Sequence, residues 1–419
     1  MSPRADPLCS NSFSATLYWA FFQRYHRELS GRTAQDRVLT PFRKSGRGKK
    51  TKMIVGVPSE IKSDEYRVAM LPVGAHLLSQ DGHQVLIQKG AGLGSGFDDD
   101  AYADVGAEVV ETAQEIFERS ELVIKVKEPQ GEEISRLRKG QTVFCYFHFA
   151  ASRELTASCL ESGITAIAYE TLKDDRGRLP LLTPMSEIAG KMSIQEGAKY
   201  LEKPMMGRGI LLGGVAGVEP AEVLILGAGV VGANAARVAA GLDAKVTIMD
   251  IDLDRLRYLD EVMPKNVTTV YSDPHAVERY AIGADLVIGA VLIPGGRAPL
   301  LIQRGLLKSM KSGAVIVDVA VDQGGCIETS SPTTHQQPTF IIDGVVHYCV
   351  ANMPGAVGRT SSHALCNATL PYCRELARHG VDSFAALSEG RAAALNTRVG
   401  KIVNPAVAAS LPDFPNCAL

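Results

Sequence analysis

The chain has 419 residues, of which 46% are hydrophobic and 21% are charged, with 44 Lys and Arg against 46 Asp and Glu. This length allows two or three domains with cores of their own, and the composition argues against a disordered chain, a coiled coil or a fibrous protein. The net charge of −2 divides unevenly, because residues 1–52 hold 11 Lys and Arg against 3 Asp and Glu, which leaves 33 against 43 for residues 53–419. We therefore expect a basic extension before an acidic globular body that has no electrostatic footprint for nucleic acid.

Residues 1–52 resemble no domain. They are rich in Arg and Ser and poor in acids, as transit peptides are, and their apolar patch Leu17–Phe22 is too short for a secretory signal. We expect a disordered leader or the product of an upstream start. Elsewhere, no apolar run approaches the roughly 18–20 residues that a membrane span needs. The eight cysteines are scattered without metal-ligand spacing, which predicts buried reduced thiols, no metal site and a cytoplasmic protein.

From Met53 onward, short β-rich runs alternate with helical stretches. The first series of predicted strands covers residues 54–57, 84–88, 122–126, 142–148 and 165–169, with helices around 72–80, 113–119 and 152–162. The second series covers residues 223–226, 245–249, 267–271, 285–291 and 314–321, with helices that start near Val230, Asp252, Pro274 and Leu301. Continuous apolar strands between helices indicate parallel sheets covered on both faces. We predict two Rossmann-like α/β domains with a cleft between them.

The segments between and after these two series are predicted to be helical. Residues 186–201 form a helix-like connector between the domains, and residues 363–379 and 383–394 read as helices that follow Arg359. We expect this tail to return to the first domain. The predicted division is then a discontinuous substrate domain of residues 53–180 and 359–419, into which a nucleotide-binding domain of residues 181–358 is inserted.

A glycine-rich turn at residues 227–232 is the strongest local signal. An apolar strand leads into Gly227-Ala-Gly229-Val-Val-Gly232 and an Ala-rich helix leaves it. Gly227 permits the tight turn, Gly229 lets the backbone approach a pyrophosphate, and Gly232 allows close packing of helix on strand. Asp250 ends the next strand, 23 residues beyond Gly227, where a carboxylate bonds both ribose hydroxyls and favours NAD over NADP. Arg255 would soften that preference. The alternative is a glycine turn without a ligand.

Three polar residues follow strands of the first series: Arg67, Lys127 and His148. Each has a structural alternative, namely a surface ion pair, a solubilising charge and a hydrogen-bonded core histidine. Together, an anion-clamping Arg, a Lys and a titratable His suit a small carboxylate substrate and an acid–base step. Asp322, just past the last strand of the second series, would face the nicotinamide end of the cleft.

The body resembles the bacterial L-alanine dehydrogenase family, a group that also contains the NAD-binding subunit of proton-translocating transhydrogenase. The resemblance covers residues 53–419 and is carried by six separated motifs in the family's order. These motifs are Gly56-Val-Pro-Ser-Glu-Ile-Lys-Ser-Asp-Glu-Tyr-Arg67-Val-Ala, Val126-Lys127-Glu128-Pro129, Tyr146-Phe-His148, Thr183-Pro-Met-Ser186-Glu187-Ile-Ala-Gly, Val319-Ala-Val-Asp322-Gln-Gly-Gly-Cys326 and Asn352-Met-Pro-Gly-Ala-Val.

The resemblance implies reversible, NAD-dependent oxidative deamination of L-alanine to pyruvate and ammonium. Arg67 and Lys127 would bind the substrate carboxylate, His148 would be the acid–base residue, and Asp322 would orient or activate ammonia or water. With the glycine turn, the residues implied to line the NAD site are Ser186, Val230, Val231, Asp250, Arg255, Ser272, Val291, Leu292, Val319, Asp322, Asn352 and Met353. A homohexamer is also implied.

Three positions depart from the family's pattern, and three other functions stay open. Asp64 stands where Asn is frequent, Ser331 where Arg is frequent, and Gly358 where Pro is frequent. Loss of a cation at Ser331 predicts weaker NAD binding, and Gly358 predicts a looser return to the first domain. The other functions are a transhydrogenase NAD-binding subunit, a saccharopine- or lysine-type dehydrogenase, and an inactive NAD-binding sensor.

Overall fold

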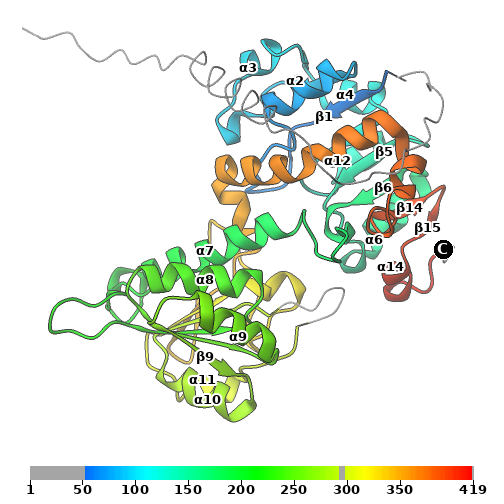
Figure 1. Cartoon of the computed structure of the whole chain (residues 1–419). Coiled ribbons are helices and arrows are strands. Elements are labelled where there is room, and N and C mark those ends of the chain that lie inside the picture. The colour runs from blue at the N-terminus through cyan, green and yellow to red at the C-terminus, as the bar shows by residue number, and fades with distance from the viewer. Residues whose placement is uncertain (1–51, 292–297, 418–419) are drawn as a thin grey trace, which may run out of the picture. The chain divides into compact units, whose positions relative to one another are not determined.

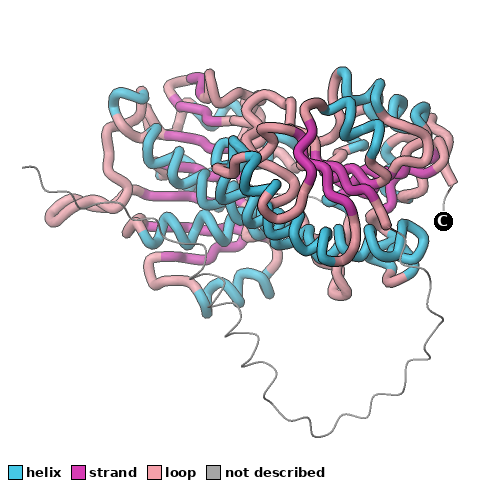
Figure 2. The backbone as a smooth tube through the Cα atoms, turned by 90° about the horizontal axis from the view of Figure 1, so that it is seen from above, coloured by secondary structure: helices cyan, strands magenta, loops and turns pink. Residues whose placement is uncertain are grey.

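The computed structural model describes residues 52–291 and 298–417, so the predicted leader lies outside the described residues except for Lys52. The described chain has an α/β fold with two mostly parallel sheets, which confirms the predicted fold class. Figures 1 and 2 show helices flanking the strands of both sheets. The strands β6, β10 and β11 are buried along their whole length, as strands covered on both faces must be.

The first sheet has eight strands in the order β15-β14-β6-β5-β4-β1-β2-β3. Its strands are β1 (Ile54–Val57), β2 (Gln84–Gln88), β3 (Glu108–Val110), β4 (Leu122–Ile124), β5 (Thr142–Cys145), β6 (Thr165–Ala168), β14 (Leu395–Arg398) and β15 (Lys401–Ile402). All pairs among β1–β6 are parallel, whereas β14 pairs antiparallel with β6 and with β15. The sequence pattern missed β3, β14 and β15, because these short strands contain polar residues and lack the continuous apolar run that marks β1 and β4.

The second sheet has seven strands in the order β12-β13-β11-β10-β7-β8-β9. Its strands are β7 (Glu222–Leu226), β8 (Lys245–Asp250), β9 (Val267–Tyr271), β10 (Leu286–Gly289), β11 (Val315–Asp318), β12 (Thr339–Ile342) and β13 (Val345–Tyr348). Only the hairpin of β12 and β13 is antiparallel among these described pairs. This hairpin was not predicted, although its turn, Asp343-Gly344, is a typical hairpin turn.

Helices connect and cover the strands. They are α2 (Pro72–Gln80), α3 (Asp99–Ala103), α4 (Ala113–Arg119), α5 (Glu132–Arg136), α6 (Arg153–Ser162), α7 (Thr183–Tyr200), α8 (Val230–Gly241), α9 (Leu253–Val262), α10 (Pro274–Gly283), α11 (Arg304–Leu307), α12 (Gly358–Ala386), α13 (Glu389–Ala392) and α14 (Pro405–Ser410). The predicted connector is α7, and the predicted tail helix is part of α12, which is interrupted at Gly380 (φ 70°, ψ 172°).

Helix α7 lies directly against α8 (Figure 1). The contact needs a glycine, because a Cβ on Gly190 would lie 2.3 Å from the carbonyl oxygen of Val231. Gly190 therefore lets the connector helix touch the first turn of α8, the helix that follows the glycine-rich turn.

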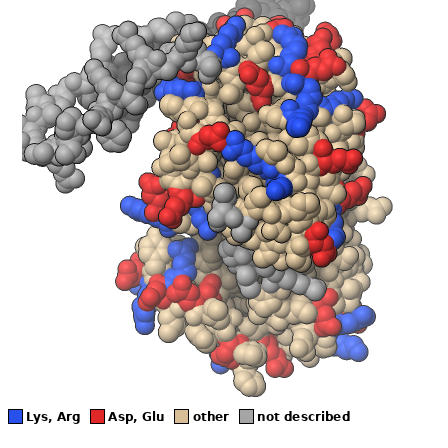
Figure 3. Space-filling model, turned by 90° about the vertical axis from the view of Figure 1, so that its right-hand side faces the viewer, with Lys and Arg blue, Asp and Glu red and all other residues tan. Residues whose placement is uncertain are grey.

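The surface carries charges of both signs. On the face shown in Figure 3, basic and acidic side chains are interspersed among uncharged residues. Within the described ranges, no helix is both long enough and apolar enough to cross a bilayer. Six of the seven described cysteines are buried free thiols, as predicted, whereas Cys417 is exposed.

Candidate functional site

The glycine-rich turn between β7 and α8 has the geometry that its glycines predict. Gly227 has φ +100°, and a Cβ there would lie 2.7 Å from the carbonyl oxygen of Ala290. A Cβ on Gly232 would lie 1.8 Å from the carbonyl oxygen of Gly227, so the helix packs directly on the turn. At Gly229, in contrast, a Cβ would meet no described atom within 4 Å. The turn is closed at Gly227 and Gly232 and open at Gly229, as a pyrophosphate cradle requires.

Helix α8 begins at this turn with an uncapped N-terminus. Gly229 is its N-cap, and no side chain accepts a hydrogen bond from the first turn. Val230, its first residue, is 37% exposed. Free N–H groups and the positive end of the helix dipole favour a phosphate at this position. The residues of the turn therefore fit a dinucleotide.

Asp250 ends β8 beside the turn and is held by backbone N–H groups. Its Oδ2 accepts a hydrogen bond from the N–H of Ala228 at 2.6 Å, and its Oδ1 accepts one from Asp252 at 3.0 Å. No Lys or Arg of the described chain forms an ion pair with Asp250. Arg255 instead donates from Nε to the carbonyl oxygen of Ala228 at 2.7 Å and lies over the ring of Tyr258. Each oxygen of Asp250 keeps a lone pair for a ribose hydroxyl.

The other residues predicted for the NAD site follow strands that are neighbours in the second sheet. Ser272 follows β9, where its N–H donates to the carbonyl oxygen of Asp250 at 3.0 Å, and Val291 follows β10. Val319 and Asp322 lie in the 3₁₀ turn Val319–Gln323 after β11. Because parallel strands end at one edge, the sheet brings these residues to the same edge as the glycine turn. Leu292 lies outside the described residues.

Three predicted residues lie away from these strand ends. Ser186 is half-buried in α7, while Asn352 and Met353 start the 3₁₀ turn Met353–Val357 that precedes α12. Asn352 has a positive φ of 62°, a conformation that Asn tolerates better than most residues.

Arg67 is buried, with 3% exposure, and its guanidinium is held in place. Its Nε donates to Glu65 Oε1 at 2.6 Å and its NH2 donates to Glu65 Oε2 and, at 2.8 Å, to Asn352 Oδ1. Its NH1 contacts the sulfur of Met185 at 3.0 Å. A thioether is a weak acceptor, so NH1 is the part of the guanidinium that has donors to offer a ligand.

Glu65 is a site residue that sequence reasoning missed. Its Oε2 also accepts a hydrogen bond from Asn352 Nδ2 at 3.0 Å, which closes a triangle of Glu65, Arg67 and Asn352. Burial by itself would raise the pKa of Glu65, but the hydrogen bonds and charge of Arg67 outweigh burial, and the pKa is lowered. The signal was present in the sequence as a carboxylate two residues before an Arg, but the partner Asn352 is 287 residues away.

Lys127 follows β4 and carries the free cation of the site. No described residue forms an ion pair or hydrogen bond with its Nζ. The pKa of Lys127 is lowered, first by burial and then by the positive charges of Arg67 and Lys62, while Glu128 and Asp322 act in the opposite sense. Lys127 therefore lies within the electrostatic field of both Arg67 and Asp322, and an anion bound there would relieve the repulsion between the two cations.

His148 lies neither in the predicted strand of residues 142–148 nor in the core, the two placements that the sequence allowed. Strand β5 ends at Cys145, and His148 adopts a left-handed conformation with φ 52° beyond it. Its side chain is exposed and stacks in parallel on Tyr146, with ring centroids 5.9 Å apart. Its N–H donates to Glu170 Oε1 at 2.6 Å. The alternative of a buried core histidine is therefore wrong, and both ring nitrogens lack a partner among the described residues.

Asp322 is exposed, and a buried neighbour positions its turn. Asp318, 1% exposed, accepts hydrogen bonds from the N–H groups of Ala320 and Cys326, each at 3.0 Å, and from Ser330 Oγ at 2.6 Å. These bonds tie together both ends of the segment that contains Asp322. Burial raises the pKa of the Asp318 carboxyl.

The departures from the family pattern have different structural settings. A Cβ on Gly358 would lie 2.4 Å from the carbonyl oxygen of Tyr66, so this glycine permits a close contact of α12 with the segment before Arg67. The expectation of a looser return at Gly358 stays a prediction. Asp64 has φ 57°, which Asp and Asn tolerate alike. Ser331 is exposed, and its effect on NAD binding stays a prediction.

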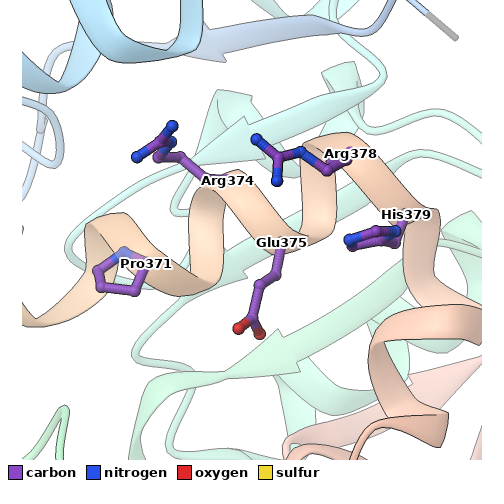
Figure 4. Close-up of a pocket in the computed structure, with 5 residues that line it drawn as sticks. All are labelled: Pro371, Arg374, Glu375, Arg378 and His379. Carbon is purple, nitrogen blue, oxygen red and sulfur yellow. The ribbon is translucent and has the colours of Figure 1, made fainter. Parts of the chain in front are cut away.

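A surface depression lies on α12, and none of its lining residues is among those predicted for the site. It is lined by Pro371, Arg374, Glu375, Arg378 and His379. In Figure 4 the two Arg side chains rise from one side of the helix while Glu375 points to the other. Both Arg residues pair with Asp81, and Glu375 pairs with Arg391. Each charged Arg and Glu side chain that lines the depression is therefore already engaged in an ion pair.

The two sheets, the glycine turn and the polar residues at neighbouring strand ends define a dinucleotide-binding α/β protein. Family models described as "Alanine dehydrogenase/PNT, N-terminal domain" and "Alanine dehydrogenase/PNT, C-terminal domain" match residues 56–189 and 193–405. The chain belongs to the alanine dehydrogenase/PNT family.

Individual relatives agree with this assignment. The chain is 51% identical to an alanine dehydrogenase of Mycolicibacterium smegmatis over 363 residues, which are 87% of this chain and 98% of the relative. It is 51% identical to an alanine dehydrogenase of Bacillus subtilis over 360 residues, which are 86% of this chain and 95% of the relative.

Two solved structures extend the comparison. A structure titled L-alanine dehydrogenase matches with a TM-score of 0.83 and 50% identity, covering 86% of this chain and 99% of its own. A transhydrogenase from Sinorhizobium meliloti matches with a TM-score of 0.71 and 26% identity, covering 84% of this chain and 99% of its own.

Proposed function

We propose that this protein is an NAD-dependent L-alanine dehydrogenase, which reversibly converts L-alanine and water into pyruvate and ammonium. The observation that carries the proposal is the meeting of unlike groups around Lys127. Arg67 follows β1, Lys127 follows β4, and Asp322 lies in the turn after β11. The charges of Arg67 and Asp322 both act on the Lys127 ammonium group. Such a site pairs two cations for a substrate carboxylate with an Asp side chain that can orient ammonia or water. The names of relatives that are about half identical support the same conclusion.

We infer the role of each residue from its contacts. Arg67, through NH1, and Lys127, through Nζ, bind the substrate carboxylate and orient Cα–H. Bound NAD supplies the hydride acceptor. His148 has an exposed ring with two free nitrogens, so it takes a proton from the water that attacks the substrate imine and gives a proton to the departing amine. Asp322 orients that water or ammonia.

The proposed nucleotide site consists of the glycine turn and the strand-end residues. The first turn of α8, with Gly227, Gly229 and Gly232, would hold the pyrophosphate, and Asp250 would accept hydrogen bonds from the ribose hydroxyls. No cation among the described residues pairs with either oxygen of Asp250, so a 2′-phosphate would be repelled and NAD is preferred over NADP. The remaining residues predicted for NAD keep that role as proposals.

We also propose the domain division, the assembly and the location. The division is a substrate domain of residues 53–180 and 359–419 and an NAD-binding domain of residues 181–358. Strands β14 and β15 support it, because they place residues 395–402 in the first sheet. A cytoplasmic homohexamer is proposed by family resemblance, and sedimentation velocity of the purified chain would give its mass.

The test is an amino-acid panel read by NADH absorbance. L-alanine, serine, glycine, lysine and saccharopine are each offered with NAD, and alanine also with NADP. We expect NADH from alanine and NAD at the highest kcat/KM. A transhydrogenase subunit would form none from alanine alone, a lysine- or saccharopine-type enzyme would prefer those substrates, and an inactive sensor would bind NADH without turnover. Any of these results would overturn the proposal.

A further inference from the structure

A buried ionic cluster lies next to Lys127 along the chain. It consists of Glu60, Lys125 and Glu133, whose side chains are 3%, 0% and 1% exposed. Lys125 Nζ lies 3.2 Å from Glu60 Oε2 and 2.9 Å from Glu133 Oε1. Buried charges are often no more stabilising than apolar residues of the same volume. Stability alone therefore does not explain why these three charges are buried together.

Glu60, unlike Glu133, also accepts hydrogen bonds from the backbone next to Lys127. Its Oε1 accepts a hydrogen bond from the N–H of Val126 at 2.6 Å, and its Oε2 accepts one from the N–H of Lys127 at 3.3 Å. The carbonyl oxygen of Val126 accepts a hydrogen bond from the N–H of Tyr146 at 3.0 Å. The peptide between Val126 and Lys127 is thus fixed on both sides, just beyond the end of β4.

These backbone hydrogen bonds matter because no described residue holds the other end of Lys127. Its Nζ has no ion pair or hydrogen bond within the described ranges. The position of the ammonium group is therefore set by the backbone at 126–127 and by the packing of the side-chain stem. A small displacement of that backbone would move the ammonium group away from a carboxylate that Arg67 also contacts.

We propose that Glu60 is a positioning residue, which places the Lys127 ammonium group for the substrate carboxylate. This inference rests on the proposed role of Lys127 in substrate binding. Lys125 orients Glu60 by pairing with Oε2. Glu133 completes the charge pairing of Lys125, but its own Oε2 accepts from the N–H of Gln130 at 3.0 Å and does not contact Lys127.

Glu133 supplies a matched control, since it is equally buried and shares the partner Lys125. Glu60→Gln replaces one carboxylate oxygen by an amide N–H₂ group, which cannot accept a hydrogen bond. The variant therefore loses one of the two acceptors that bond the N–H groups of Val126 and Lys127. We expect Glu60→Gln to raise the KM for L-alanine and for pyruvate by roughly tenfold to a hundredfold, with the KM for NAD unchanged. Glu133→Gln should leave all three KM values near those of the wild type. Equal shifts in the two variants, or a wild-type KM in Glu60→Gln, would overturn the proposal.

A second pair of variants protects the test against loss of folding. Glu60→Asp and Glu133→Asp keep the charge that Lys125 needs, but the shorter side chain of Glu60→Asp no longer reaches both N–H groups. We expect the KM for L-alanine to rise in Glu60→Asp and not in Glu133→Asp, at matched thermal stability. A wild-type KM in Glu60→Asp would contradict the proposal that the two hydrogen bonds to the backbone position Lys127.

A readout without turnover separates this proposal from the proposed function. The full-length protein is trace-labelled with acetic anhydride, and the rate at the Lys127 amine is measured by mass spectrometry. We expect that rate to change in Glu60→Gln and to stay at the wild-type value in Glu133→Gln. If the wild type formed no NADH from alanine, the proposed function would fail while this contrast still decided the role of Glu60. Identical labelling in both variants would sink that role.

Discussion

Hydrogen bonds within the described residues fix the backbone of His148 and not its ring. The left-handed conformation at φ 52° is unfavourable for a residue other than glycine. It persists because Glu170 accepts hydrogen bonds from the N–H groups of Phe147 and His148. The ring then stands free beside Tyr146, with both nitrogens available for proton transfer.

Replacing His148 should separate chemistry from nucleotide binding. We expect His148→Ala to lower kcat by about 10²–10⁴-fold, the usual contribution of a general acid–base group, while NADH binding followed by fluorescence is unchanged. His379→Ala, another exposed histidine far along the chain, is the control and should keep wild-type turnover. Near-normal turnover in His148→Ala would show that the assigned role is wrong.

The Glu65–Arg67 pair should be much more sensitive to substitution than a surface pair. The side chains of Glu65 and Arg67 are 0% and 2% exposed, so Glu65→Gln leaves a buried guanidinium without its counter-charge. We expect the free energy of unfolding in urea to fall by about 3–5 kcal/mol. Glu111→Gln breaks the exposed pair with Lys89, and its unfolding curve should overlay that of the wild type. A similar small change in both variants would contradict this account.

At the scale of elements, the sequence pattern predicted the parallel core of both sheets but not their antiparallel edges. β1, β2 and β9 match the predicted bounds, because continuous apolar runs between helices have a clear signature. Strands β14 and β15 have four and two residues and polar members, so they carry no pattern and form through pairing with β6. The predicted runs to His148 and Val321 stop early because the chain turns at the strand ends where the site residues stand.

The candidate site shows the same division between local and distant signals. Arg67, Lys127, His148 and Asp322 were found because residue type and strand-end position are visible in the sequence. Their supports were missed for different reasons. Glu60 bonds a backbone N–H 66 residues away, and Asn352, a partner of Glu65, is 287 residues away, so these contacts leave no local trace. Asp318 has local partners, but it lay inside the predicted strand of residues 314–321.

The contact between α7 and α8 gives a prediction at this scale. Gly190→Ala places a methyl group where the carbonyl oxygen of Val231 lies 2.3 Å away, so the two helices must separate. We expect a loss of about 1–3 kcal/mol in unfolding free energy and a higher KM for NAD, since Val231 belongs to the first turn of α8. Gly241→Ala, at the end of α8, meets no described atom within 4 Å and is the matched control. Its KM for NAD should equal that of the wild type.

For the whole molecule, a buried histidine predicts how stability depends on pH. His347 is 0% exposed. Its Nδ1–H donates to the carbonyl oxygen of Val345 at 3.0 Å, because a carbonyl can only accept, and its Nε2 then accepts from Thr329 at 2.8 Å. Burial lowers the pKa of this imidazole. As the pH falls through about 6.5, this histidine therefore takes up a proton in the unfolded chain but stays neutral in the folded chain.

Stability should consequently fall as the pH drops below about 6.5, by at most about 1.4 kcal/mol per pH unit from this group. Urea unfolding at a series of pH values between neutral and mildly acidic measures the slope. His347→Gln should flatten it, whereas His379→Gln should retain it. Glu60 and Asp318, whose carboxyls have raised pKa values, act in the opposite sense. The difference between His347→Gln and wild type isolates the histidine, and parallel curves would refute the assignment.

The place of β14 in the first sheet has a consequence for synthesis on the ribosome. β14 covers the edge of β6, a strand that is buried along its whole length. Residues 395–402 are translated after all seven strands of the second sheet, so the nascent first sheet keeps a bare apolar edge while the second is completed. Such an edge is a template for mispairing with other chains. Premature termination shortly before Leu395 should thus yield aggregated product, even though every residue proposed for catalysis is already present.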